Sequence, residues 1–198
     1  MAVYNPNIAP FINQTFWVTS EFWEERSASG GGVRYHKGLD IAVPFDITNP
    51  TDVYVYSMCN GVCIDRGYDA DGYGNYLILK ADDGTGFLYG HLRIPQLPVL
   101  VDVGDRVTIG QAVGYEGSTG ASTGPHLHLE MQPLGTGTYW YHGDDITRYI
   151  NPADWMGIPN VEGIECYYDG NPIFPSKEKK RFPWVLYAKK LRNRGKIY

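Results

Sequence analysis

One stretch of the chain, residues 118–130, decides how the rest is interpreted, and it reads STGASTGPHLHLE. In an extended strand, successive side chains point to opposite faces. A strand that starts at the end of this stretch places His126 and His128 on one face and Leu127 and Leu129 on the other. The leucine face is expected to pack on a core. On the histidine face, one imidazole could bind a metal while its neighbour stays free nearby.

Two further motifs carry the same kind of side chain, HKGLD at 36–40 and YGH at 89–91. With the first stretch they hold four of the five histidines of the chain and one aspartate. The spacing of four residues returns His36 and Asp40 to one face of a strand or a helical turn. Imidazoles and a carboxylate suit Zn²⁺, with an open position for water and two imidazoles left for proton transfer. The alternative is that these are ordinary surface or core histidines.

Composition and turn signals indicate a β protein. The chain has 198 residues, enough for one domain with a sizeable core, and contains 24 Gly, 13 Pro and 16 Tyr. We expect a hairpin that joins strands at 52–58 and 62–64 across Asn60-Gly61. A second hairpin is expected to join residues 76–80 to 86–89, and a short helix is expected within 146–156.

The motifs resemble those of the lysostaphin/LytM-type zinc endopeptidases, which cut peptide bonds in bacterial peptidoglycan. The matching stretches are HKGLDIA at 36–42, GNYLI at 74–78, YGHL at 89–92, the segment 101–111, and residues 118–130. Together they cover most of the chain between residues 15 and 133. Relatives often have alanine where this chain has Gly90, which is a small change.

The resemblance implies an all-β fold, an antiparallel sheet sandwich with a short helical or irregular C-terminal extension. It implies an N-terminal arm at 1–14, a zinc peptidase domain at 15–158 and a C-terminal extension with a basic tail at 159–198. It assigns Zn²⁺ to His36, Asp40 and His128 and leaves His91 and His126 as catalytic residues.

The function expected from the resemblance is that of a zinc metalloendopeptidase. Its substrate would be the stem peptides or cross-bridges of peptidoglycan. A different class stays open, because some proteins of this fold serve as non-catalytic wall-binding or structural virion modules. The complete set of ligands and free imidazoles favours the enzyme.

Charge is distributed unevenly along the sequence. Residues 176–198 contain nine Lys or Arg and one acid, whereas the rest of the chain contains eight basic and 21 acidic residues. The tail could bind an anionic wall polymer or a virion protein, or it could be a solvated or packed segment. Nucleic acid is not expected, because the predicted catalytic domain is acidic and would be repelled.

Localisation and cysteine chemistry follow from smaller signals. The N-terminal residues show neither the basic nor the apolar part of a secretory signal, and no run approaches the length of a membrane span. We therefore expect action at the extracellular wall or on a virion, as for a phage lysin. Three cysteines are an odd number and cannot all pair within one chain, so we expect reduced thiols and not a disulfide framework. Residues 69–72 are expected to form a plain turn, because an acidic residue that would close a calcium loop is absent.

Overall fold

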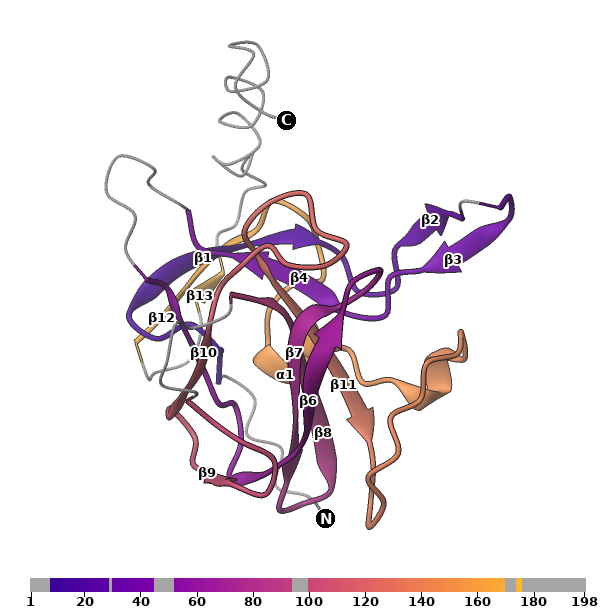
Figure 1. The fold of residues 1–198 in the computed structure, drawn as a ribbon. Helices are drawn as coiled ribbons and strands as arrows, with labels where there is room; N and C mark the ends of the chain where they lie inside the picture. The colour runs from indigo at the N-terminus through magenta and orange to yellow at the C-terminus, as the bar shows by residue number, and fades with distance from the viewer. Residues whose placement is uncertain (1–7, 29, 45–51, 94–99, 170–173, 176–198) are drawn as a thin grey trace.

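A computed structural model describes residues 8–28, 30–44, 52–93, 100–169 and 174–175 (Figure 1). These residues fold into strands, one 3₁₀ turn at Ile146–Arg148 and one short helix, α1 (Pro152–Met156). The strands are β1 (Gln14–Ser20), β2 (Glu25–Ser27), β3 (Val33–Tyr35), β4 (Leu39–Ala42), β5 (Tyr54–Tyr56), β6 (Gly61–Asp69), β7 (Gly74–Ala81), β8 (Thr85–Leu92), β9 (Arg106–Val107), β10 (Ala112–Tyr115), β11 (Leu127–Pro133), β12 (Glu165–Tyr168) and β13 (Phe174–Pro175).

Within the described residues, most strands join one sheet of nine, in the order β13-β12-β1-β4-β11-β8-β7-β6-β9. Its neighbouring strands pair antiparallel. Two smaller antiparallel pairs, β5 with β10 and β2 with β3, complete the arrangement. The predicted all-β antiparallel fold class is confirmed.

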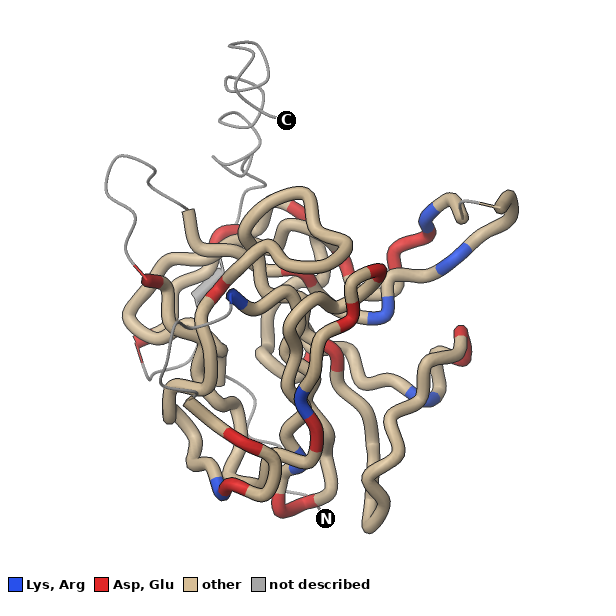
Figure 2. The backbone as a smooth tube through the Cα atoms, viewed as in Figure 1, with Lys and Arg blue, Asp and Glu red and all other residues tan. Residues whose placement is uncertain are grey.

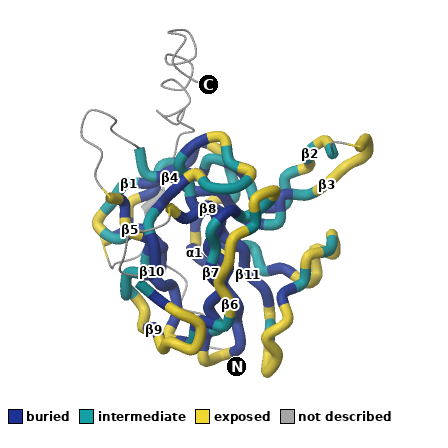
Figure 3. The backbone as a smooth tube through the Cα atoms, viewed as in Figure 1, coloured by how far each residue is buried: buried dark blue, intermediate teal, exposed yellow. Residues whose placement is uncertain are grey.

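The core forms around the middle of the large sheet. Every residue of β8 is buried, and Figure 3 shows this burial along the strand. Phe87 and Tyr89 belong to the main hydrophobic cluster, whereas Leu88 packs with Ile78 and Trp140 on the other face. Leu127 and Leu129 are fully buried in the main cluster, as the period of two predicts. The two leucines therefore fix the face on which the neighbouring histidines lie.

One predicted hairpin is confirmed and the other is wrong. β7 and β8 pair across residues 82–84, as expected. β5, however, pairs with β10, and β6 pairs with β7 and β9, so Asn60-Gly61 joins two different sheets. A Cβ on Gly61 would lie 2.1 Å from the carbonyl oxygen of Lys80. Glycine is therefore required here by a close approach of β7 rather than by a two-residue hairpin turn.

The C-terminal part follows the short helix. α1 lies within the predicted range, and the Asn151 side chain caps it by accepting from the Ala153 amide. The sequence predicts a helical or irregular extension after it, but the described part supplies β12, which pairs with β1. The expected boundaries at 14/15 and 158/159 stay predictions. The basic tail at 176–198 lies outside the described residues.

Three smaller expectations concern the cysteines, a turn and membrane spans. Cys59, Cys63 and Cys166 are free and buried, so the prediction of reduced thiols is confirmed. Residues 69–72 form a turn in which the Asp71 amide donates to the Asp69 carboxylate at 3.2 Å. Among the described residues, no helix has the length and apolar character needed to span a membrane.

Candidate metal centre

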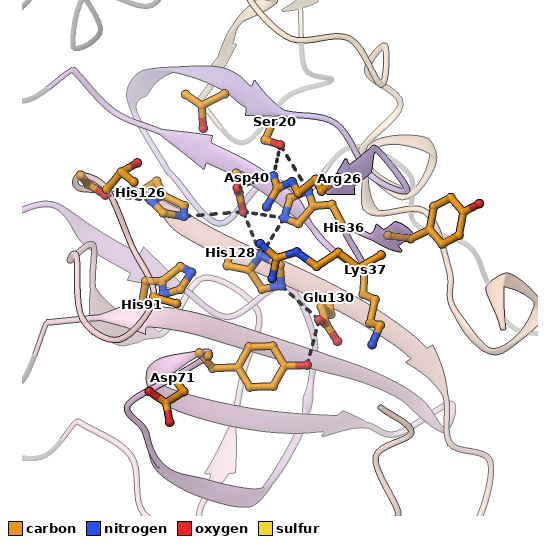
Figure 4. Close-up of a pocket in the computed structure, with 18 of the residues that line it drawn as sticks. Ser20, Arg26, His36, Lys37, Asp40, Asp71, His91, His126, His128 and Glu130 are labelled. Atoms are coloured by element: carbon orange, nitrogen blue, oxygen red, sulfur yellow. Dashed lines mark hydrogen bonds and ion pairs between the residues drawn. The ribbon is translucent and has the colours of Figure 1, made fainter. Parts of the chain in front are cut away.

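Adjacent strands bring the sequence motifs together. Asp40 on β4 lies directly opposite His128 on β11, and His128 lies opposite Gly90 on β8. His91 follows Gly90, and His126 lies immediately before β11, where it forms an isolated bridge to Gly117. All four predicted imidazoles and the predicted aspartate therefore line one groove of about 700 Å³ (Figure 4).

Three of these side chains form a compact set of ligand atoms. His36 Nε2 lies 3.1 Å from Asp40 Oδ1 and 3.0 Å from His128 Nδ1, and His128 Nδ1 lies 2.8 Å from Asp40 Oδ1. Ligand atoms at normal bond lengths from a tetrahedral Zn²⁺ lie roughly 3.3 Å from one another. All three residues are buried, and the set could hold a metal ion. The spacing thus fits a small cation.

The outer nitrogens of the two ligand imidazoles are already used. His36 Nδ1 lies 2.7 Å from the Glu21 carbonyl, which can only accept, so this nitrogen carries the proton. His128 Nε2 lies 3.1 Å from Glu130 Oε1. The two remaining nitrogens, His36 Nε2 and His128 Nδ1, lie 3.0 Å apart, and both would give their lone pairs to a bound cation.

The electrostatics of the three side chains also favour a cation. Burial alone would raise the pKa of Asp40, but the neighbouring His36 and His128 outweigh it and hold the pKa well below its ordinary value. Burial alone would lower the pKa of His128, but hydrogen bonds to Asp40 and Glu130 raise it to about 9. Two carboxylates thus create a site at which positive charge is stabilised.

Glu130 contacts the candidate ligand His128, although the sequence motif alone gave it no role. It is 1% exposed, and its Oε1 accepts from His128 Nε2 and from the Tyr73 hydroxyl at 2.9 Å. Its Oε2 accepts from Trp140 Nε1 at 3.2 Å. The hydrogen bonds hold the pKa of Glu130 below its ordinary value against the effect of burial, which raises it. The period of two, which places Glu130 on the same face as His128, is a signal that could have identified it.

His91 and His126 present free nitrogens to the groove. His91 Nδ1 donates to the Thr119 carbonyl at 2.8 Å, and His126 Nδ1 donates to the Gly124 carbonyl at 2.8 Å. Each Nε2 therefore keeps its lone pair, and that of His126 lies 3.7 Å from Asp40 Oδ1. Burial lowers the pKa of His91 to about 4 and also lowers the pKa of His126. Both imidazoles are neutral bases at neutral pH.

The backbone at His91 adopts an uncommon conformation. Its φ is 59°, in the left-handed region that residues other than glycine rarely adopt. The Gly117 segment passes so close that a Cβ there would lie 2.6 Å from the His91 carbonyl oxygen. Strain of this kind persists where the surroundings fix it, and here it occurs one residue before the end of β8, at an imidazole that lines the groove.

The groove also contains charged residues outside the predicted site. Arg26 lies above the centre in Figure 4, with its Nη2 3.6 Å from Asp40 Oδ2, and Asp71 lies on the opposite side. Lys37 lines the groove and pairs with Asp144 at 3.1 Å. His142, which fits no motif, has its ring 6.2 Å from that of Tyr73. Arg26 lies on β2, outside the motifs, whereas Lys37 lies within the motif at 36–40 but was given no role there.

Comparison with known proteins identifies the family. A family model described as peptidase family M23 matches residues 34–140, more than half of the chain. The chain belongs to peptidase family M23. This confirms the resemblance to the lysostaphin/LytM-type peptidases, and the matched residues contain every member of the site. A zinc-containing peptidase of known structure from Vibrio cholerae is 29% identical, with a TM-score of 0.55, and the match covers 76% of this chain and 39% of that chain.

Curated relatives share only part of their length with this M23 chain. An uncharacterized metalloprotease of Buchnera aphidicola is 32% identical over 136 residues, which is 69% of this chain and 28% of that protein. The peptidoglycan DD-endopeptidase ShyA of Vibrio cholerae is 35% identical over 97 residues (48% and 20%). Lysostaphin of Staphylococcus staphylolyticus is 37% identical over 101 residues (50% and 18%). The chain thus spans less than a third of the length of these relatives.

Proposed function

We propose that this chain is a zinc-dependent endopeptidase that hydrolyses peptide bonds in the stem peptides or cross-bridges of bacterial peptidoglycan. One observation carries the proposal. Three ligand atoms converge within 3.1 Å of one another, and two further imidazoles beside them keep free Nε2 lone pairs. The relatives support the substrate class, since ShyA is a peptidoglycan DD-endopeptidase.

The ligand roles follow from the hydrogen-bond pattern. His36 Nε2, Asp40 Oδ1 and His128 Nδ1 would hold the ion. The second polar atom of each side chain faces another group: the Glu21 carbonyl for His36, Glu130 for His128 and Arg26 for Asp40. A zinc ion bound there lowers the pKa of water to about 7 and polarises the carbonyl of the scissile bond.

His91 and His126 are proposed as the proton-transfer residues. Their rings lie 4.6 Å apart, and each is fixed by a backbone carbonyl so that Nε2 faces the groove. One accepts the proton of the attacking water at its Nε2 and, as an imidazolium, passes that proton to the leaving amine. The other assists at the leaving amine or, once its own Nε2 has taken a proton from solvent, stabilises the oxyanion. Neutral imidazoles are suited to accept protons near pH 7, and such acid–base help contributes about 10²–10⁴-fold.

The test is digestion of several purified peptidoglycan types, with the fragments identified by mass spectrometry and the zinc content of the protein measured in parallel. We expect one zinc per chain and new amino termini at a single kind of peptide bond. Loss of digestion after chelation and its return with zinc would support the metal role. Intact walls in every preparation, together with wall binding, would instead support a non-catalytic wall-binding or structural virion module. Action at the extracellular wall or on a virion stays a prediction.

A further inference from the structure

The hairpin of β2 and β3 places two arginines directly opposite each other. Arg26 and Arg34 are paired across the two strands and both line the groove of the metal centre. Figure 1 shows the hairpin projecting from the sheet, and Figure 2 shows both cations on it. Like charges directly opposite each other destabilise a strand pair. An anion bound beside these two arginines in the groove would therefore reduce the repulsion between them.

Arg26 is already paired with acidic and polar side chains of the protein. Its Nε lies 3.1 Å from Glu24 Oε2, its Nη2 contacts the Ser20 hydroxyl, and the same nitrogen lies 3.6 Å from Asp40 Oδ2. These contacts hold its guanidinium beside the metal ligands (Figure 4). Arg26 thus contributes a fixed positive charge to this wall of the groove, but its donors are largely occupied.

Arg34 is different. In the part of the chain that the structure describes, its exposed side chain makes no hydrogen bond, ion pair or ring contact. The other described cations all have a partner in the protein. These partners are Asp144 for Lys37, Asp102 for Arg66, Gly137 for Lys80, Asp52 for Arg93, Asp82 for Arg106 and the Tyr141 ring for Arg148. An unpaired arginine in an acidic protein, at the rim of its own catalytic groove, has its donors available for a ligand.

We propose that Arg34, with the fixed charge of Arg26 behind it, forms a subsite that binds a carboxylate of the peptide in the groove. The guanidinium presents two parallel N–H donors that match the two oxygens of a carboxylate. Asp71 lies across the metal centre from Arg26, so the groove has a cationic side and an acidic side (Figure 4). The acidic side repels a carboxylate, which therefore binds on the hairpin side. This inference rests on the proposed function and specifies an acidic peptide as the preferred substrate.

The experiment compares one set of peptides in two chemical forms. Cross-linked peptide dimers released from a single wall preparation are kept as free acids or converted to primary amides with carbodiimide and ammonia. The ratio of kcat/KM for acid over amide is measured for the zinc-loaded parent, Arg34→Gln, Arg34→Lys and Arg106→Gln. Arg106 is a matched control, because it is exposed on β9 and pairs with Asp82. Equilibrium binding of the acid and amide product peptides is measured in the same proteins.

We expect the parent and Arg106→Gln to prefer the acid by about tenfold, since a charge-assisted contact at an exposed site is partly screened. Arg34→Gln should bring the ratio close to one by losing activity on the acid while cleaving the amide as the parent does. Arg34→Lys should retain part of the preference, and added salt should reduce it in the parent.

The outcomes separate this subsite from the proposed function. A parent that does not distinguish acid from amide, or an Arg34→Gln variant with the parent's ratio, overturns the subsite while hydrolysis upholds the peptidase. If no peptide is cleaved but acid-selective binding of the products depends on Arg34, the subsite stands and the proposed function fails.

Discussion

At the scale of single residues, the acceptor bonded to each imidazole decides what that imidazole can do. His91 and His126 donate Nδ1–H to backbone carbonyls, so replacing either ring should leave the three ligand atoms in place. We expect His91→Ala and His126→Ala each to bind zinc as the parent does and to lose about 10²–10⁴-fold in hydrolysis, or about 3–5 kcal/mol in barrier. Metal analysis and rate measurements on the same samples test this.

The control for these variants is His142→Ala, which removes an imidazole that belongs to no motif and should keep both zinc and activity. If His91→Ala or His126→Ala loses its zinc, ligand and catalytic roles have been exchanged in our assignment.

Glu130 leads to a second prediction at this scale, Glu130→Gln. Its two oxygens accept from three donors, His128 Nε2 and the Tyr73 hydroxyl on one side and Trp140 Nε1 on the other. An amide has one acceptor oxygen, so its NH₂ group must face a donor in either orientation. We expect zinc affinity to fall by about 10–100-fold, the usual cost of losing an outer partner of a metal-bound histidine.

Competition with a zinc-binding dye measures this affinity independently of activity. The matched control is Glu162→Gln, since Glu162 is an exposed carboxylate. An unchanged zinc affinity in Glu130→Gln would mean that Glu130 serves packing and not the orientation of His128.

At the scale of elements, the turn between His36 and β4 must pass very close to β11. A Cβ on Gly38 would lie 2.6 Å from His128 Cε1 and 2.7 Å from the Leu129 carbonyl oxygen. Because the carbonyl belongs to a central strand, the ligand ring or the turn must move. We expect Gly38→Ala to weaken zinc binding by about tenfold or more and to cost about 1–3 kcal/mol in stability.

Gly30→Ala is the control for this change, because nothing lies within 4 Å of a Cβ there. It should be neutral or slightly stabilising, since alanine restricts the unfolded chain. Equal zinc affinity in the two variants would show that the close approach at Gly38 does not constrain His128. Zinc titration and thermal unfolding supply the two measurements.

The segment after β10 contains a buried carboxyl group that makes stability depend on pH. Burial raises the pKa of Glu116 to about 8, although a hydrogen bond from the Val43 amide at 2.9 Å opposes the shift. Between about pH 4.5 and pH 8 the folded protein therefore holds a proton that the unfolded chain releases. This contribution lowers the free energy of unfolding as pH rises through that interval.

Glu116→Gln removes the titration and keeps an oxygen for the Val43 amide. We expect the variant to gain stability over the parent from about pH 5 to about pH 8, with no further gain above. Urea unfolding across this interval measures the difference. If the difference in free energy of unfolding between the variant and the parent stays constant across the interval, Glu116 is ionised in the folded protein throughout.

At the scale of elements, sequence patterns predict some features of the fold and site but not others. The period of two in residues 126–130 predicts the buried leucines and the shared face of the histidines, because successive side chains of a strand point to opposite faces. The hairpin predicted across Asn60-Gly61 is wrong, because glycine is required there by a close contact with β7 that the local sequence does not encode. Arg34 lies only two residues before His36, but the sequence did not show that residues 25–27 and 33–35 pair and place it beside Arg26 in the groove.

At the scale of the whole molecule, the sequence separates a basic tail from an acidic remainder. Residues 176–198 carry nine Lys or Arg and one acid, and the remainder carries eight basic and 21 acidic residues. An acidic surface is repelled by an anionic cell wall, whereas the tail is attracted to it. We therefore propose that the tail brings the candidate metal centre to an anionic wall without taking part in the chemistry.

Deleting residues 176–198 should accordingly weaken binding to whole walls at low salt, and the loss should shrink as salt shortens the screening length to about 10 Å at 0.1 M. Cleavage of a small soluble peptide should be unchanged, because the candidate metal ligands lie within residues 36–128, far from the tail in sequence. A second variant keeps the length of the tail but has Gln in place of its nine basic residues. It distinguishes an effect of the charge from an effect of the aromatic residues Phe182, Trp184 and Tyr187. That variant should bind walls as weakly as the deletion. If it binds like the parent, or if the deletion alone lowers the melting temperature by several degrees, the tail acts through packing and not through attraction to the wall.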